Sequence, residues 1–354
     1  MRAIALFAIL CLLASMTGLQ SIRTNATDIV IANGRLPKII TDAQGTIHLT
    51  YGAGDSIMYM SSANQGVSFS TPQLVAFLPK LFANAMRGPQ IAAASNGIII
   101  TANTEYGNIY SYRRNVDGKW SKAVKVNDVD SVSKEALTSL SADGSNVFAV
   151  WLDVRANGGK GQRLFGAHSS DGGVSWSKNI MIYASPDKTI CECCKPSVLV
   201  KGKNVYSMFR NWLNGDRDLY LIKSSDEGKS FGPASKLGMG SWKLNGCPMD
   251  GGGLALSANG IIETVWRREG NIYASSEGEA ERLLGEGRGC SMAIVNEKNV
   301  YTWTKNGEVV IMKPGSQITT LGKGSVPVIN AINNEKVICI WEHDDQIHTS
   351  VVQL

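Results

Sequence analysis

A short turn sequence recurs along this chain, and it constrains the fold more than any other feature. Its full form is Ser-x-Asp-x-Gly-x-Ser followed by an aromatic residue, at residues 169–176 and 224–231. Residues 62–69 repeat it with Asn in place of Asp, and residues 116–120 keep a shortened copy. An Asp or Asn side chain bonds the backbone ahead of it and glycine accepts a positive φ, so each copy predicts a tight hairpin turn.

The strands between these turns form seven similar units. Each unit has an apolar first strand, a turn and a second strand that ends at a polar loop; the first strands begin near Pro37, Pro89, Leu137, Pro196, Gly253, Met292 and Pro327. The last unit lacks an outer strand, and residues 28–31 can supply it, which leaves no open sheet edge. The sequence predicts an all-β propeller of six or seven four-stranded blades, as a single domain over residues 27–354.

The first residues have the pattern of a secretory signal. Met1 and Arg2 precede an apolar run over residues 3–14, and small and polar residues follow through Ala26. An apolar run of about a dozen residues is too short to span a membrane but fits a signal peptide. We expect residues 1–26 to be removed and the mature protein to be secreted or periplasmic.

The charge of the chain indicates no nucleic acid and no membrane surface as partner. The net charge is only +5 over 354 residues, and the charges are spread along the sequence. Basic patches or stripes are the usual footprint of such partners. We expect a monomer.

The repeated turns resemble the Asp boxes, or bacterial neuraminidase repeats, of sialidase-like β-propellers. The run Gly34-Arg35-Leu36-Pro37 resembles the Arg-Ile-Pro motif that opens the first sialidase blade. Arg210 and Arg217 lie where the fourth blade carries arginines, and Arg267 and Arg268 lie where the fifth blade does. In that family three arginines bind the carboxylate of sialic acid, a group that the guanidinium fork matches. The resemblance implies an acidic sugar or glycoconjugate as partner.

The bond-breaking half of the sialidase pattern is not matched. Sialidases place a glutamate before the fourth blade and a tyrosine nucleophile before the sixth. Here these positions read Cys193-Cys194-Lys195 and Gly289-Cys290-Ser291, with only a shifted Glu192 as candidate glutamate. If the protein is a glycoside hydrolase, carboxylates such as Asp153 or Asp250 would serve as acid or base, since this chemistry usually needs a carboxylate pair.

Five cysteines precede the first strands of three adjacent units: Cys191, Cys193, Cys194, Cys247 and Cys290. Disulfides persist in an exported protein, so bonds between blades are one interpretation. A thiolate-bound metal, with Met249, Asp250 or His343 in reserve, is the other. No further cofactor is expected.

The sequence therefore favours a secreted sialidase-like propeller that acts on or binds acidic carbohydrate through an arginine-lined central pocket. In its enzyme form it would be a glycoside hydrolase of the exo-α-sialidase type. Two alternatives stay open: a non-catalytic propeller that binds carbohydrate or protein, and a cysteine-rich metal or redox site on the propeller face.

Overall fold

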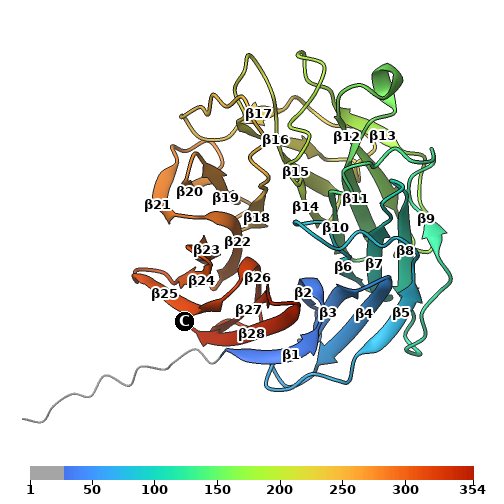
Figure 1. The fold of residues 1–354 in the computed structure, drawn as a ribbon, viewed down its shortest axis with the longest axis vertical. Helices are drawn as coiled ribbons and strands as arrows, with labels where there is room; N and C mark the ends of the chain where they lie inside the picture. The colour runs from blue at the N-terminus through green and yellow to red at the C-terminus, as the bar shows by residue number, and fades with distance from the viewer. Residues whose placement is uncertain (1–27) are drawn as a thin grey trace, which may run out of the picture.

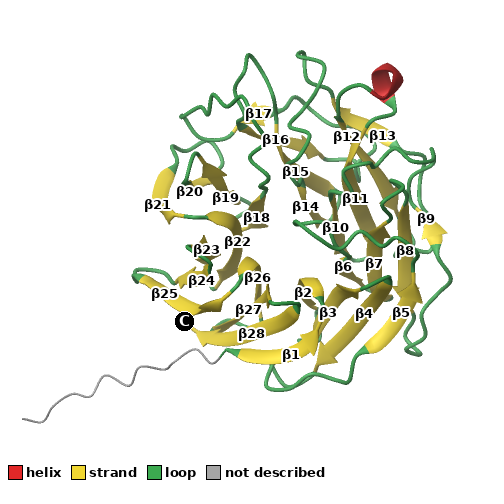
Figure 2. Ribbon diagram, viewed as in Figure 1, coloured by secondary structure: helices red, strands yellow, loops and turns green. Residues whose placement is uncertain are grey.

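The computed structural model describes residues 28–354, and the predicted signal peptide at residues 1–26 lies outside them. Strands make up 54% of the chain and helix 1%, so the all-β prediction is confirmed. The described residues form seven four-stranded antiparallel sheets, arranged as blades around one axis (Figure 1, Figure 2). The propeller prediction is confirmed, with seven blades.

The first strand of each blade lies nearest the axis and contacts the first strands of both neighbouring blades. These strands are β2 (Arg35–Thr41), β6 (Gln90–Ala94), β10 (Thr138–Asp143), β14 (Ser197–Lys201), β18 (Gly252–Leu256), β22 (Arg288–Val295) and β26 (Ser325–Ala331). The second strands are β3 (Ile47–Ala53), β7 (Gly97–Asn103), β11 (Asn146–Asp153), β15 (Asn204–Arg210), β19 (Ile262–Arg268), β23 (Lys298–Lys305) and β27 (Lys336–His343).

The remaining strands complete each blade toward the outside. The third strands are β4 (Ser56–Ser62), β8 (Ile109–Arg114), β12 (Arg163–Ser169), β16 (Leu219–Ser224), β20 (Asn271–Ser276), β24 (Glu308–Met312) and β28 (Gln346–Gln353). The outer strands are β5 (Gln73–Phe77), β9 (Val124–Lys125), β13 (Ile180–Tyr183), β17 (Ser235–Lys236), β21 (Arg282–Glu286), β25 (Ile318–Lys323) and β1 (Ile29–Asn33). One 3-10 helix, η1 (Ala156–Gly159), lies between β11 and β12.

The ring closes through strands from opposite ends of the described chain. β1 pairs with β28 in the seventh blade, where Ile29 lies opposite Thr349 (Figure 1). Asp28 also contacts His348, with 2.6 Å between Oδ1 and Nδ1. This pairing supplies the outer strand that the seventh unit lacks on its own.

The repeated turns share one hydrogen-bond pattern. In the fourth blade the Ser224 hydroxyl donates to Asp226 at 2.7 Å and accepts from the Gly228 amide at 2.9 Å. Asp226 also accepts from the Ser230 amide at 2.9 Å. Bonds to the charged form lower the pKa of Asp226, the largest coming from the hydroxyls of Ser224 and Ser230. The local sequence thus fixes the turn by satisfying its own backbone.

Each turn also locks its blade onto the preceding one. Gly228 has φ +82° and its backbone lies against the Phe148 ring of the third blade, so a side chain there would meet both strain and a clash. Phe231 contacts the same ring edge-on, with 5.8 Å between centroids. Glycine and the aromatic residue are therefore needed for blade packing as well as for the turn.

The core lies between adjacent blades, and the second strands are its most buried part. Trp151, Trp303 and Trp341 are fully buried in β11, β23 and β27. Within residues 28–354, no helix is long and apolar enough to cross a membrane. A rigid ring of packed blades thus holds the loops that surround the axis.

Candidate functional site

A central cavity of about 210 Å³ opens on the propeller axis, and all seven first strands or the loops before them contribute to its wall. Its charged lining residues are Lys38, Lys195 and Asp250. Gln90 and Ser139 add polar groups from β6 and β10. The cavity is therefore small and polar, and its ionisable groups are two amines and one carboxyl group.

The two lysines lie side by side in this cavity. Lys195 donates from Nζ to Oε1 of Gln90 at 2.7 Å. Burial lowers the pKa of Lys38 to about 8. Burial, and then the charge of Lys38, hold the pKa of Lys195 well below its usual range. Within residues 28–354 neither ammonium group has a carboxylate partner within 4.0 Å, so the pair is short of negative charge.

Asp250 is buried at the cavity wall. Its carboxylate accepts from the Gly251 amide at 2.8 Å and lies 3.5 Å from Nη1 of Arg267. Burial raises the pKa of Asp250, and the positive charges of Arg210 and Arg267 oppose this rise. The effect of burial is larger, because the free-energy cost of removing a carboxylate from water exceeds the stabilisation that these contacts give.

Arg210 is buried at the end of β15, where main-chain carbonyls accept hydrogen bonds from both terminal nitrogens of its guanidinium. Nη1 donates to the carbonyl of Arg217 at 2.6 Å, and Nη2 donates to that of Arg267 at 2.7 Å. Its guanidinium also lies over the Trp242 ring, 5.3 Å from the centroid. Among residues 28–354 no arginine lines the cavity, which therefore differs from the arginine-lined pocket that the sequence predicts.

Arg267 and Arg217 are also tied to loops. Arg267 donates to the carbonyls of Pro248 and Glu269 at 3.2 and 3.1 Å. Arg217 stacks on Trp212 at 4.0 Å and donates from Nη1 to Sγ of Cys191 at 3.1 Å. Together with Arg210, these two arginines place positive charge beside Asp250 and Cys191.

Four of the five cysteines gather beside these arginines. Cys193 and Cys247 form a disulfide that links the loops before β14 and β18. Sγ of Cys191 lies 3.1 Å from Sγ of Cys194 and 4.0 Å from Sγ of Cys193. The disulfide interpretation therefore holds for one pair, and with Cys193 bonded two free thiols remain in this cluster.

The fifth of these cysteines, Cys290, and a further cysteine, Cys339, stand apart from this cluster. Cys290 is a buried free thiol at the cavity wall, and burial raises its pKa well above the usual range. Cys339 is fully buried within β27, as expected for a small hydrophobic side chain.

Two predicted ligand arginines lie away from the cavity. Arg35 is half exposed and pairs with Asp345 at 2.8 Å and Glu342 at 3.3 Å, in a separate surface pocket. Arg268 pairs with Glu281 and lies over the Tyr273 ring at 4.1 Å. Neither residue lines the cavity that holds Lys38 and Lys195.

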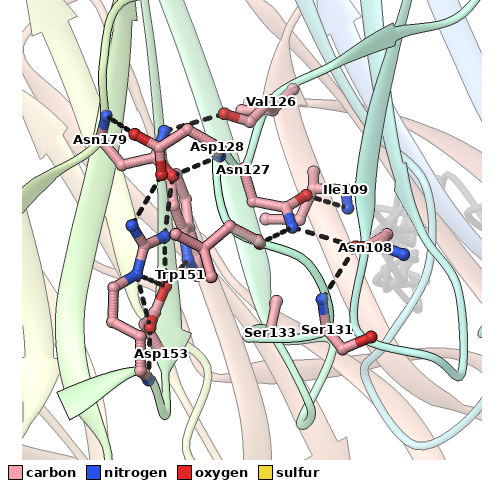
Figure 3. A network of polar contacts seen from close by, with 12 residues as sticks. Asn108, Ile109, Val126, Asn127, Asp128, Ser131, Ser133, Trp151, Asp153 and Asn179 are labelled. Carbon is pink, nitrogen blue, oxygen red and sulfur yellow. Dashed lines mark hydrogen bonds and ion pairs between the residues drawn. The ribbon is translucent and has the colours of Figure 1, made fainter.

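Asp153, a predicted acid or base, belongs to a network between the second and third blades (Figure 3). It is fully buried, accepts from Nε1 of Trp151 at 2.8 Å and binds Nη2 of Arg155 at 2.9 Å. Arg155 reaches on to Asp128 at 2.7 Å, which bonds in turn to Asn179. The structure does not bring Asp153 and Asp250 together at the cavity.

Sequence reasoning did not single out Lys38, Lys195 or Gln90. A signal was present in Pro37-Lys38-Ile39-Ile40, where a charge interrupts an apolar first strand. The first strands line the axis, so such a residue faces either the cavity or the neighbouring blade. Lys195 directly follows the cysteine run, and that run by itself predicts disulfides or a metal site and not an amine site.

No protein-family model matches this sequence, and neither does any curated protein sequence. Solved structures are similar in fold. A lectin from Burkholderia pseudomallei matches with TM-score 0.63 and 9% identity, over 90% of this chain and 96% of the lectin. An α-L-arabinofuranosidase from Fusarium graminearum matches with TM-score 0.54 and 11% identity, over 93% of this chain and 98% of the arabinofuranosidase. A Hadza microbial sialidase matches with TM-score 0.51 and 12% identity, over 92% of this chain and 66% of the sialidase.

At these identities the likeness defines the fold and leaves the activity open. The protein is a seven-bladed β-propeller of the sialidase-like fold.

Proposed function

We propose that this protein binds an anionic sugar in the central cavity, with Lys38 and Lys195 as the groups that hold the anion. The observation that carries this proposal is the pair of adjacent, half-buried amines without a carboxylate partner. Two amines brought together out of water repel one another, so the empty site has an electrostatic cost. A bound carboxylate would relieve that repulsion and raise both pKa values.

The size and lining of the cavity suit one sugar residue. Drug-sized ligands occupy pockets of about 300–1,000 Å³, and this cavity is smaller, at about 210 Å³. Gln90, Ser139 and Ser197 offer hydrogen-bonding groups for hydroxyls around the two lysines. The lectin, arabinofuranosidase and sialidase among the similar structures support carbohydrate as the ligand class.

Binding is favoured over hydrolysis because the cavity is poor in carboxylates. Glycoside hydrolysis usually uses two carboxyl groups, one on each side of the scissile bond. Among the described residues that line the cavity, Asp250 is the single carboxylate. We therefore propose a recognition protein, and its N-terminal apolar run and its disulfide support a location outside the cytoplasm.

Calorimetry with paired sugars tests this function. Sialic acid and uronic acids should bind, and the corresponding neutral sugars should bind at least tenfold more weakly, a difference of about 1.4 kcal/mol. Lys38→Met and Lys195→Met should each weaken binding of the acidic sugar by at least tenfold.

Two controls make the result specific. Lys201→Met alters an exposed lysine at the far end of β14, paired with Asp143, and should leave affinity unchanged. Arg35→Ala should also leave it unchanged, since Arg35 lines another pocket. The proposal fails if no acidic sugar binds at millimolar concentration. Release of free sugar that Asp250→Asn abolishes would instead show a hydrolase.

A further inference from the structure

The cysteine cluster has no role in the proposed sugar site, yet its geometry is that of exchanging sulfurs. Cys191 lies beside both a free thiol and a disulfide, with its Sγ 3.1 Å from Cys194 and 4.0 Å from Cys193. Cys193 is already bonded to Cys247. A thiol this close to a disulfide sulfur needs only a small movement to attack it.

The four sulfurs differ in their access to solvent. Cys191 and Cys194 are 0% and 2% exposed, so external reagents do not reach them directly. Cys247 is an exposed residue on the loop before β18. A buried dithiol is thus connected to the surface through one disulfide.

We propose that Cys191, Cys194, Cys193 and Cys247 form a thiol–disulfide relay that passes two electrons between the buried dithiol and an external thiol or disulfide at Cys247. This inference is independent of the sugar-binding function, because none of these four sulfurs lines the central cavity.

Exchange among the four cysteines conserves electrons and atoms without an added oxidant or reductant. The Cys191 thiolate attacks Sγ of Cys193, the Cys193–Cys247 bond breaks, and Cys247 leaves as a thiolate. Cys194 then loses its proton and attacks Sγ of Cys191, which releases Cys193 as a thiolate. The Cys191–Cys194 pair has been oxidised by two electrons and the Cys193–Cys247 pair reduced by two, and the one proton that Cys194 loses goes to one of the two released thiolates. This is thiol–disulfide exchange, in which a thiolate attacks a disulfide sulfur through a mixed-disulfide intermediate.

The surroundings make Cys191 the attacking sulfur. Arg217 donates to its Sγ at 3.1 Å. The hydrogen bond with Cys194, followed by the charges of Arg210 and Arg217, lowers the pKa of Cys191 to about 6 against the effect of burial. Burial raises the pKa of Cys194 well above its usual range. One thiolate beside one thiol is the division of roles that exchange requires.

The relay touches the loops that build the sugar site. Lys195 follows Cys194 directly, and Asp250 lies three residues after Cys247. The Cys193–Cys247 bond joins these two loops, and exchange to the Cys191–Cys194 bond would remove this covalent link while the hydrogen bond from the Lys195 amide to the Asp250 carbonyl, at 3.0 Å, remains.

Maleimide labelling of the purified protein without any reductant tests the relay. Internal exchange releases the exposed Cys247 thiol, so maleimide should accumulate on Cys247 while a Cys191–Cys194 disulfide forms, both read by peptide mass spectrometry. In Cys191→Ser the attacking sulfur is gone, and Cys247 labelling should slow at least tenfold. In Cys194→Ser the first step should be trapped as a Cys191–Cys193 bond with labelled Cys247.

Cys290→Ser is the matched control, since it removes a buried thiol that lies outside the cluster, and it should label like the wild type. The relay is rejected if wild-type Cys247 stays unlabelled in folded protein. Equal labelling of Cys247 in the wild type and in Cys191→Ser also rejects it. The wild-type measurement decides the matter even if one variant fails to fold.

Discussion

Arg210 donates from Nη2 to the main-chain carbonyl of Arg267 at 2.7 Å, so the end of the fourth blade is fastened to the end of the fifth. Nη1 of Arg210 likewise donates a hydrogen bond to the main-chain carbonyl of Arg217 at 2.6 Å. Arg210 is 2% exposed, and its positive charge favours the charged form of Asp250. Its guanidinium therefore acts as a structural clamp between two blades.

Arg210→Met should destabilise the protein, because it leaves two buried carbonyls without donors. Bonds from a charged donor are worth about 1.5–3 kcal/mol each, so urea unfolding should show a loss of about 3 kcal/mol or more. Arg35→Met is the control, since its ion pairs are half exposed and should change stability by about 1 kcal/mol or less. Equal losses for the two variants would contradict the clamp.

Binding of an acidic sugar should be coupled to proton uptake. The pKa of Lys38 is lowered to about 8 by burial, and an anion raises it again. Affinity should be highest below pH 8 and fall as pH rises through 8, when Lys38 loses its proton beside Lys195, Gln90 and Asp250. Calorimetry in buffers of different ionisation enthalpy measures the uptake directly. Affinity that stays constant from pH 6 to pH 10 would exclude Lys38 as an anion ligand.

Asp153→Asn should reduce stability without changing sugar affinity. The carboxylate is fully buried and holds both Trp151 and Arg155, and loss of one partner of a buried ion pair costs about 3–5 kcal/mol. Thermal unfolding and calorimetry on the same sample give both quantities. Asp128→Asn, whose side chain is 40% exposed, should cost much less. A loss of sugar binding in folded Asp153→Asn would assign Asp153 to the site after all.

Loss of the disulfide should lower stability through the unfolded state. The bond joins residues 54 apart in sequence, and a loop of this length corresponds to about 4 kcal/mol in the chain-entropy estimate. Cys247→Ser should therefore lower the unfolding midpoint in urea under non-reducing conditions. In the presence of reductant the wild type and the variant should agree. A difference that persists in reductant would indicate that Cys247 packs as well as cross-links.

The fold could be predicted from the sequence because its key signals are local. Ser224, Asp226 and Gly228 specify the turn within five residues, and the hydrogen bonds that fix it join these same residues. The apolar first strands repeat along the chain and indicate a propeller of six or seven blades, and the structure has seven. Even the pairing of β1 with β28 follows from a missing strand at one end and a spare strand at the other.

The candidate site could be predicted only in part, because its chemistry depends on contacts between blades. Arg210 and Arg267 are placed at strand ends by the pattern, but the carbonyls that occupy Arg210 come from distant residues. Lys195 meets Gln90 across 105 residues of sequence. The partner of Cys193 likewise depends on which loops of neighbouring blades approach one another, so the sequence left the pairing open.

The pairing of β1 with β28 also sets an order of events during synthesis. Asp28 and His348 are 320 residues apart, and β28 is the only described strand that pairs with β1. At about 5–20 residues per second, β1 leaves the ribosome on the order of 16–64 s before its partner. Through that interval the nascent chain carries an unpaired strand that another chain can adopt. The ring can therefore close only after β28 has been synthesised, and mispairing between neighbouring nascent copies should be sought before that point.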